Sequence, residues 1–202
     1  RFDSVSWLYA FSLVTMLLAV ILTIPARLRH HSAPWAWAGS LIVTGSALLA
    51  IVAENPLTLV LAWSVIDLIE IGLILIGVIE HGSKDRAIVT YAARVAGTLV
   101  VVWTMALSQS LSLAMDFEAV SSEAGLYLLL AAGLRLGVVP LYVPYVKENP
   151  KRRGFGTIVR LASPASSLVV LGHLPDLVIP YGWAVSLSGF TALAAIYGSF
   201  MW

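Results

Sequence analysis

Seven runs of about 20 apolar residues, separated by short polar segments, constrain this chain more than any other feature of its sequence. A run of this length spans a bilayer as a helix, because a backbone exposed to lipid must satisfy its own hydrogen bonds. The runs are too long and too evenly apolar for the alternating strands of a membrane barrel. The predicted helices cover residues 5–24, 37–53, 57–79, 87–114, 125–146, 156–172 and 177–202.

The composition favours a membrane domain and leaves little of the chain for any other kind of domain. Charged residues make up 11% of the sequence, whereas a soluble domain contains about 25%. We therefore expect residues 1–202 to form a single all-α, polytopic membrane domain. No nucleotide loop, metal cluster or paired nucleophile and base is recognisable, and the lack of cysteine excludes iron–sulfur clusters. We expect no catalytic residue, metal, cofactor or nucleic-acid partner, and no enzyme activity of this chain alone.

Basic residues gather in alternate loops and predict how the chain is oriented. Eight Lys and Arg residues lie in the loops after the first, third and fifth predicted helices, while the N-terminal segment and the other loops hold only Arg1. Because basic loops stay in the cytoplasm, we expect a multi-pass protein of the inner (cytoplasmic) membrane with its N-terminus outside. Asp3 and the four histidines lie in loops or at helix ends, where we expect them to be solvated. Residues that fit interfacial aromatic belts are Trp35, Trp37, Trp183 and Trp202.

Five charged residues lie inside the predicted helices, where burial in a membrane is costly. They are Asp67, Glu70, Arg94, Arg135 and Arg160. An ionisable group at this depth faces the protein interior or water, and it marks a candidate functional site. Asp67 and Glu70 are three residues apart and share a helix face with Ser64. The five residues could form an ion-pair network that locks helices together, or a polar axis that carries protons or ions.

Two prolines lie beside these charges and predict helix breaks. Pro140 lacks the N–H that would bond the carbonyl of Leu136, and Pro164 similarly frees the carbonyl of Arg160. Broken helices next to charges form the ion sites of transporters, although kinks also shape packing in many membrane helices. The closeness of Pro140 to Arg135, and of Pro164 to Arg160, favours a conduction site.

A series of short motifs, in a fixed order along the chain, carries a family resemblance. The motifs are Phe2-Asp3-Ser4-Val5-Ser6-Trp7, Val52-Ala53-Glu54-Asn55-Pro56-Leu57 with Ala62-Trp63 after it, Ala92-Ala93-Arg94-Val95, Arg135-Leu136-Gly137-Val138-Val139-Pro140 and Gly189-Phe190-Thr191-Ala192-Leu193. Together they resemble the antiporter-like membrane subunits of respiratory complex I and of multi-subunit cation/proton antiporters. The resemblance implies about fourteen helices, built as two inverted five-helix repeats with flanking helices. The chain would hold the first repeat, with its helix broken at Pro140, and about half of a family member.

The resemblance also identifies family positions that are substituted in this chain. Ser64 replaces a glutamate, Arg135 a lysine, Arg160 a histidine, and Ser166 a further lysine of some members. Lysine can release a proton near neutral pH when it is buried, whereas arginine remains charged. Asp67, one turn from Ser64, and Glu70 are therefore the acids expected to titrate, facing Arg94 or Arg135.

These features lead to one functional prediction and two alternatives. The prediction is an antiporter-like subunit that translocates protons or cations within a larger, redox-driven or ion-motive complex. Asp67 and Glu70 would accept protons or cations, Arg135 and Arg160 would set their electrostatic field, and Arg94 would bridge. The alternatives are a non-conducting membrane anchor that kept the fold, and the membrane half of a bicarbonate-accumulating system with a zinc-bearing partner. Expected partners are the lipid bilayer, other membrane subunits and a soluble arm or partner protein.

Overall fold

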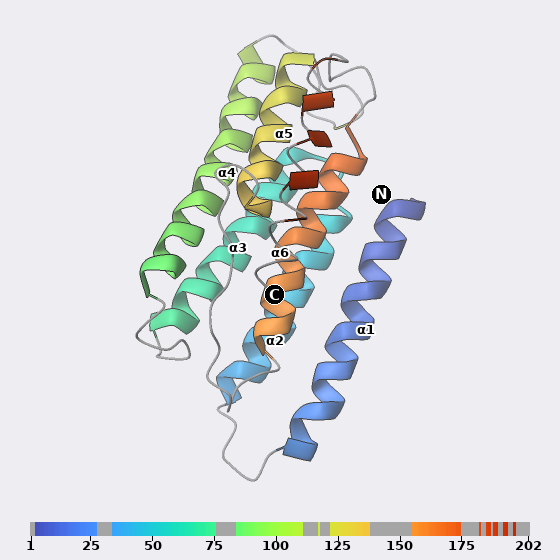
Figure 1. The fold of residues 1–202 in the computed structure, drawn as a ribbon, viewed down its shortest axis with the longest axis vertical. Coiled ribbons are helices and arrows are strands. Elements are labelled where there is room, and N and C mark those ends of the chain that lie inside the picture. Colours follow the sequence, from blue (N-terminus) through green and yellow to red (C-terminus); the bar gives the residue numbers. More distant parts are fainter. Residues whose placement is uncertain are drawn as a thin grey trace.

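The structure, a computed structural model, contains helices only in the part of the chain that it describes. That part comprises residues 3–27, 34–75, 84–110, 117, 122–137 and 155–174, with eight residues between 182 and 196. Its six helices are α1 (Ser4–Arg27), α2 (Pro34–Ile51), α3 (Pro56–Leu75), α4 (Lys84–Ser110), α5 (Ser122–Leu136) and α6 (Phe155–Gly172) (Figure 1). The prediction of an all-α fold is therefore confirmed.

Two of the helices are long and apolar enough to cross a membrane. They are the segments Ser4–Thr23 of α1 and Ile88–Ser110 of α4, so the described residues contain fewer such helices than the seven predicted. Shorter apolar segments are Trp37–Ile51, Ala124–Leu136 and Leu161–Gly172. The predicted helix 177–202 lies outside the described residues except at eight positions, each of which is helical.

Local capping signals determine where two of the helices begin. The carboxylate of Asp3 accepts the backbone N–H of Ser6 at 2.7 Å and caps α1. The side-chain oxygen of Asn55 accepts the backbone N–H of Thr58 at 2.8 Å and caps α3. Pro56 follows as the first residue of α3, a position where its missing N–H costs nothing. The Asn55-Pro56 pair of the family-like motif is thus a helix start.

Of the two prolines predicted to break helices, the structure describes Pro164. α5 ends at Leu136, before the predicted end at residue 146, and Gly137 follows with a φ of 77°, which favours glycine. Pro140 lies outside the described residues. α6 continues through Pro164, so this proline does not end the helix. The helix tolerates the proline because only the bond to the carbonyl of Arg160 is lost.

The helices pack as a bundle in which α1 lies at one edge against α2 and α6 (Figure 1). The hydroxyl of Ser6 donates to the carbonyl of Ile51 at 3.3 Å, which joins the start of α1 to the end of α2. α3 starts shortly afterwards, at Pro56. His173, at the end of α6, lies against Asp3. The start of α3 and the end of α6 therefore lie at the same end of the bundle, and these two helices run in opposite directions.

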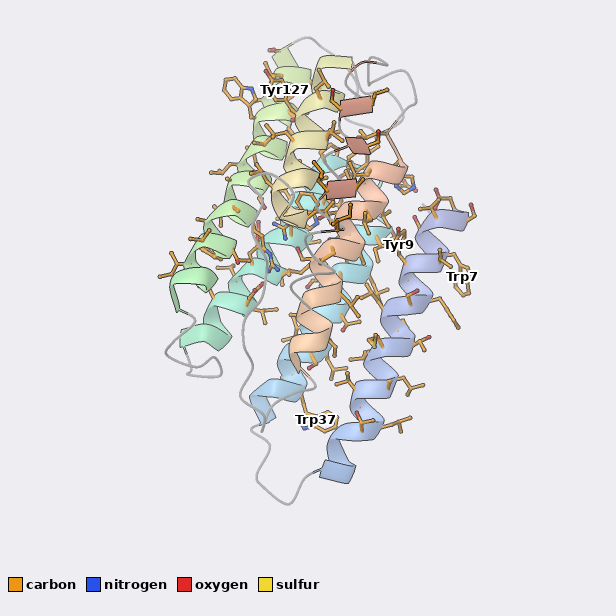
Figure 2. All side chains as sticks on the ribbon, viewed as in Figure 1. Trp7, Tyr9, Trp37 and Tyr127 are labelled. Carbon is orange, nitrogen blue, oxygen red and sulfur yellow. The ribbon has the colours of Figure 1, made fainter. Side chains whose placement is uncertain are left out.

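The outer surface of the bundle is apolar. On α1 alone, large apolar side chains that are more than half exposed are Trp7, Leu8, Phe11, Leu18 and Leu22. Exposed side chains of the same kind on α3 and α4 are Leu57, Leu61, Leu68, Ile88, Leu99 and Trp103. Aromatic residues lie toward opposite ends of the bundle, for example Tyr127 and Trp37 (Figure 2). A soluble monomer rarely exposes so much apolar surface, whereas contact with lipid makes it favourable.

Candidate functional site

Asp67 and Arg135 form a buried ion pair between α3 and α5. Arg135 Nη1 donates to Asp67 Oδ2 at 2.7 Å, and Nη2 donates to Asp67 Oδ1 at 3.0 Å. Two parallel bonds of this kind match the planar guanidinium to the carboxylate and form a strong pair. Arg135 is 1% exposed and Asp67 is 4% exposed. Because water barely reaches either charge, each depends on the other for stabilisation.

Contacts from two neighbouring helices fix the position of the Arg135 guanidinium. Nη1 also donates to Thr98 Oγ1 at 2.9 Å and to the carbonyl oxygen of Arg94 at 3.3 Å, both on α4. The guanidinium carbon lies 4.3 Å from the centroid of the Trp63 ring on α3, a cation–π contact. Among the described residues, Arg135 Nε has no hydrogen-bond partner. Arg135 thus ties α3, α4 and α5 together.

A glycine on α4 allows Arg135 to approach these partners. A β-carbon at Gly97 would lie 2.9 Å from the carbonyl oxygen of Ala131 and 3.0 Å from Arg135 Cγ, both on α5. These distances are too short for an ordinary side chain, so α4 and α5 can pack this closely only with glycine at this position. Gly97 therefore sets the spacing at which Thr98 reaches Arg135.

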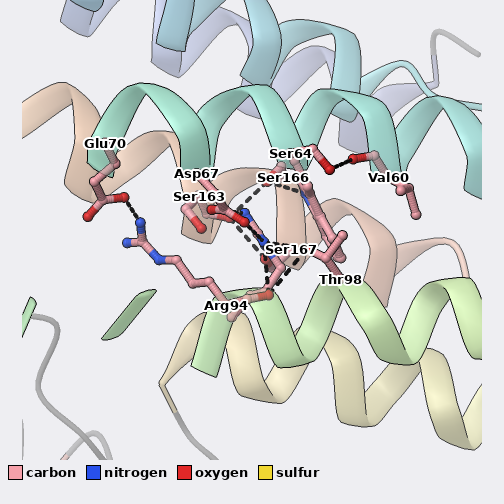
Figure 3. Close-up of polar contacts among 11 residues, drawn as sticks. Val60, Ser64, Asp67, Glu70, Arg94, Thr98, Ser163, Ser166 and Ser167 are labelled. Atoms are coloured by element: carbon pink, nitrogen blue, oxygen red, sulfur yellow. Dashed lines mark hydrogen bonds and ion pairs between the residues drawn. The ribbon is translucent and has the colours of Figure 1, made fainter. Parts of the chain in front are cut away.

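A second ion pair joins α3 to α4 one turn further along α3. Arg94 Nη1 donates to Glu70 Oε2 (Figure 3). The side chain of Arg94 is 4% exposed and that of Glu70 is 13% exposed. The Asp67 side chain, by comparison, is 5% exposed. Glu70 is therefore the more exposed of the two carboxylates.

The two ion pairs belong to one hydrogen-bonded network, because the carbonyl oxygen of Arg94 also accepts from Arg135. Two carboxylates and two guanidiniums balance in charge. Of these four groups, only the carboxylates of Asp67 and Glu70 can lose their charge by taking up a proton, since arginine stays protonated. A proton that reaches the network therefore neutralises a carboxylate and leaves excess positive charge beside it. The network can bind and release protons only through its two acids.

Ser64 and Ser166, which the resemblance matched to a glutamate and a lysine, lie outside the ion pairs. The hydroxyl of Ser64 donates to the carbonyl of Val60 in its own helix at 2.7 Å. Ser166 Oγ accepts a hydrogen bond from Trp63 Nε1 at 3.0 Å. The acid that meets the arginine of α5 is therefore Asp67, one turn further along α3.

The structure brings four of the five charged residues predicted inside helices into this network. They are Asp67, Glu70, Arg94 and Arg135. The fifth, Arg160, lies in α6, but its side chain is outside the part of the chain that is described. Pro140 is outside it altogether. The roles predicted for Arg160 and Pro140 therefore stay predictions.

Three contributors to the site were not predicted as site residues: Trp63, Gly97 and Thr98. Helical spacing could have identified two of them, because Trp63 precedes Asp67 by one turn and Thr98 follows Arg94 by one turn. No local signal identifies Gly97, since its importance lies in how closely a second helix approaches.

Asp3 and His173, which we expected to be solvated, instead meet at one end of the bundle. His173 Nε2 lies 2.7 Å from Asp3 Oδ2. The backbone N–H of Ser6 lowers the pKa of the Asp3 carboxyl well below its ordinary value, and the hydroxyl of Ser6 and the His173 ring act in the same direction. The ionised form of Asp3 therefore caps α1 and fastens it to the end of α6.

We expect Asp3→Ala to lower the free energy of unfolding by about 1 kcal/mol at pH 7, because α1 loses its cap. Asp3→Asn, which keeps a capping oxygen, should cost less. Because folding lowers the pKa of Asp3, the ionised carboxyl stabilises the protein above about pH 4, and this contribution falls as the pH drops further. Thermal unfolding at pH 7 and at pH 3 measures both effects. A difference between parent and Asp3→Ala that grows toward low pH would contradict this account.

Within the described residues, no three His, Cys, Asp or Glu side chains gather to hold a metal ion. Comparisons of the chain with protein-family models, with curated proteins and with solved structures found no match. The family resemblance of the motifs therefore stays a prediction. Function is inferred from the geometry of the four charged residues and from the apolar surface around them.

Proposed function

We propose that this chain is an antiporter-like membrane subunit of a larger complex and that it translocates protons or cations across the inner membrane. One observation carries the proposal: two buried carboxylates of α3 pair with two arginines of the adjoining helices. Ionisable groups inside a membrane domain are costly and typically mark pathways for protons or ions. In this proposal the full chain crosses the membrane seven times.

The exposed apolar surface supports the membrane location. Trp7, Phe11 and Leu22 of α1 are each more than half exposed, and water would disfavour such a surface on a free monomer. The charged network, in contrast, is turned inward. Apolar groups outside and paired charges inside are the arrangement expected of a helix bundle surrounded by lipid.

The arrangement of helix ends supports the proposed orientation. Asp3, Glu54 and His173 lie at the end of the bundle where α1 and α3 begin. α4 begins with Lys84, after α3 has run to the opposite end. Acidic groups at one end and basic groups at the other agree with an N-terminus outside and basic loops in the cytoplasm.

In the proposed mechanism, Glu70 and Asp67 exchange protons beside the guanidiniums of Arg94 and Arg135. Glu70 is the more exposed acid, so it takes a proton from water first. The lost negative charge leaves the guanidiniums of Arg94 and Arg135 in excess, and this excess favours release of the proton. The proton therefore stays only briefly, as a relay requires. Arg160 would extend the field toward α6.

The two-bond geometry of the Asp67–Arg135 pair favours a second candidate, a membrane anchor that does not conduct. The guanidinium makes two bonds to Asp67, one to Thr98 and a ring contact with Trp63. A buried pair held by several contacts can act purely as a lock between helices. In this candidate the chain holds partner subunits at the membrane. The chains that co-purify with it would distinguish a redox arm, a set of antiporter subunits and a zinc-bearing bicarbonate partner.

The transport proposal is tested by proton flux through the full chain in liposomes after a pH jump. We expect flux in the parent and its loss, to the level of protein-free liposomes, in the Asp67→Asn/Glu70→Gln double variant. Parental flux in the folded double variant would overturn the carboxylate relay. No flux in the parent would overturn transport and favour the anchor.

Ser64→Ala is the matched control for this experiment. Ser64 lies on the same helix, one turn before Asp67, but its hydroxyl donates to the carbonyl of Val60 in its own helix. Its removal leaves both ion pairs intact, so flux should equal that of the parent. Loss of flux in this variant would contradict the assignment of Asp67 and Glu70 as the titrating groups.

A further inference from the structure

α6 carries three fully buried serines, one of which, Ser166, contacts Trp63 of α3. Ser163, Ser166 and Ser167 are each 0% exposed. The hydroxyls of Ser166 and Ser167 donate to the carbonyl oxygen of Ser163 at 2.8 and 2.9 Å. Ser163 Oγ, by contrast, has no hydrogen-bond partner among the described residues. A buried hydroxyl without a partner is unfavourable, and a bound water is the usual way to satisfy it.

The register between α3 and α6 brings Ser163 level with Asp67. Trp63 Nε1 donates to Ser166 Oγ at 3.0 Å, which fixes one pair of facing positions. The two helices run in opposite directions. Asp67, one turn after Trp63 on α3, is therefore level with Ser163, about one turn before Ser166 on α6. Figure 3 shows the Ser163 side chain at the level of the Asp67 carboxylate, as this register requires.

Two acceptors lie at this level besides the Ser163 hydroxyl. Each oxygen of Asp67 accepts one bond from Arg135 and has lone pairs left for further donors. The carbonyl oxygen of Arg160, less than one turn before Ser163, lacks its helical donor because Pro164 has no N–H. A water molecule needs two to four polar partners, and these three groups supply them.

We propose that a buried water binds between α3 and α6, where it accepts from the Ser163 hydroxyl and donates to the Asp67 carboxylate. Its second proton is directed at the carbonyl of Arg160. This water joins α6 to the ion-pair network, which otherwise involves α3, α4 and α5. Its role as a carrier of protons to Asp67 rests on the proposed transport function, whereas the site itself rests on Ser163 and the register.

The test is infrared spectroscopy of the full chain in lipid, recorded in ordinary water and in water labelled with oxygen-18. A trapped water gives an O–H stretching band that shifts with the isotope, and no protein group in that region does. We expect this band in the parent, its loss in Ser163→Ala and its retention in Ser167→Ala. Ser167 is the matched control because it is equally buried but its hydroxyl is already bonded to the carbonyl of Ser163.

Substitutions on α3 test the other partner of the water. We expect Asp67→Asn to shift the isotope-sensitive band and Glu70→Gln to leave it unchanged. No isotope-sensitive band in the parent would overturn the proposal, as would a band that is unaltered in folded Ser163→Ala. The band does not depend on flux, so a chain that shows the band but does not conduct would overturn the transport function and leave the water site standing.

Discussion

Replacing Asp67 with asparagine is expected to lower the free energy of unfolding by about 3–5 kcal/mol. The substitution preserves the size of the side chain but removes the negative charge opposite Arg135. Arg135 stays protonated, and at 1% exposure it cannot recover hydration. A buried charge without a counter-charge is among the costliest defects in a protein. Unfolding of the full chain in mixed micelles, followed by the loss of helical circular dichroism, measures the difference.

Glu70→Gln, one turn further along α3, is the matched control for this result. It also removes one carboxylate charge, but its ion pair is less buried: the Glu70 and Arg94 side chains are 13% and 4% exposed, against 5% and 0% for Asp67 and Arg135. The loss of stability should therefore be clearly smaller than for Asp67→Asn. Equal losses in the two variants, or an unchanged stability of Asp67→Asn, would contradict the buried pairing of Asp67 with Arg135.

Gly97→Ala is expected to lower the free energy of unfolding by about 1–3 kcal/mol, although alanine is the better helix former. The new methyl group would lie 2.9 Å from the carbonyl oxygen of Ala131 and 3.0 Å from Arg135 Cγ. α4 must then move away from α5, which stretches the bond from Arg135 to Thr98. The same mixed-micelle unfolding experiment measures the loss.

Gly45→Ala on α2 is a control that should change the free energy of unfolding in the opposite direction. A β-carbon at Gly45 would have nothing within 4 Å, so the substitution adds no clash. Helix propensity then acts alone and should raise the stability by up to about 1 kcal/mol. If Gly97→Ala were as stable as Gly45→Ala, close packing of α4 on α5 at Gly97 would be refuted.

Apolar runs were sufficient to predict most of the helices. The run predicted to start at residue 57 corresponds to α3, and the run that ends near Gly172 corresponds to α6. The sequence did not determine how the chain passes Pro164, where the helix continues. A single lost hydrogen bond costs little when packing on both sides holds the helix, and packing cannot be read from one segment.

The charged residues of the site were recognised because they interrupt apolar helices, but their pairing was not determined. Spacing places Asp67 and Glu70 on one face of α3, and it leaves open which arginine meets which acid. The structure pairs Asp67 with Arg135 and Glu70 with Arg94. That choice depends on the approach of α4 to α5 at Gly97, a contact between segments far apart in the sequence.

The contact between Asp3 and His173 also could not be predicted from the sequence. Asp3 and His173 were assigned to solvent as single residues, because nothing in the local sequence of either one indicates the other. Their pairing depends on the direction of α6 relative to α1, which only the assembled bundle determines.

Proton flux through the Asp67→Leu/Arg135→Met double variant tests the central claim most directly. Replacing both members of a buried ion pair with apolar residues leaves no unpaired charge, so the variant should be about as stable as the parent. It can no longer take up a proton at position 67. We expect a folded protein whose flux after a pH jump is lost, although Glu70 and Arg94 are intact. Flux equal to that of the parent would contradict the relay and reduce the pair to a lock between helices.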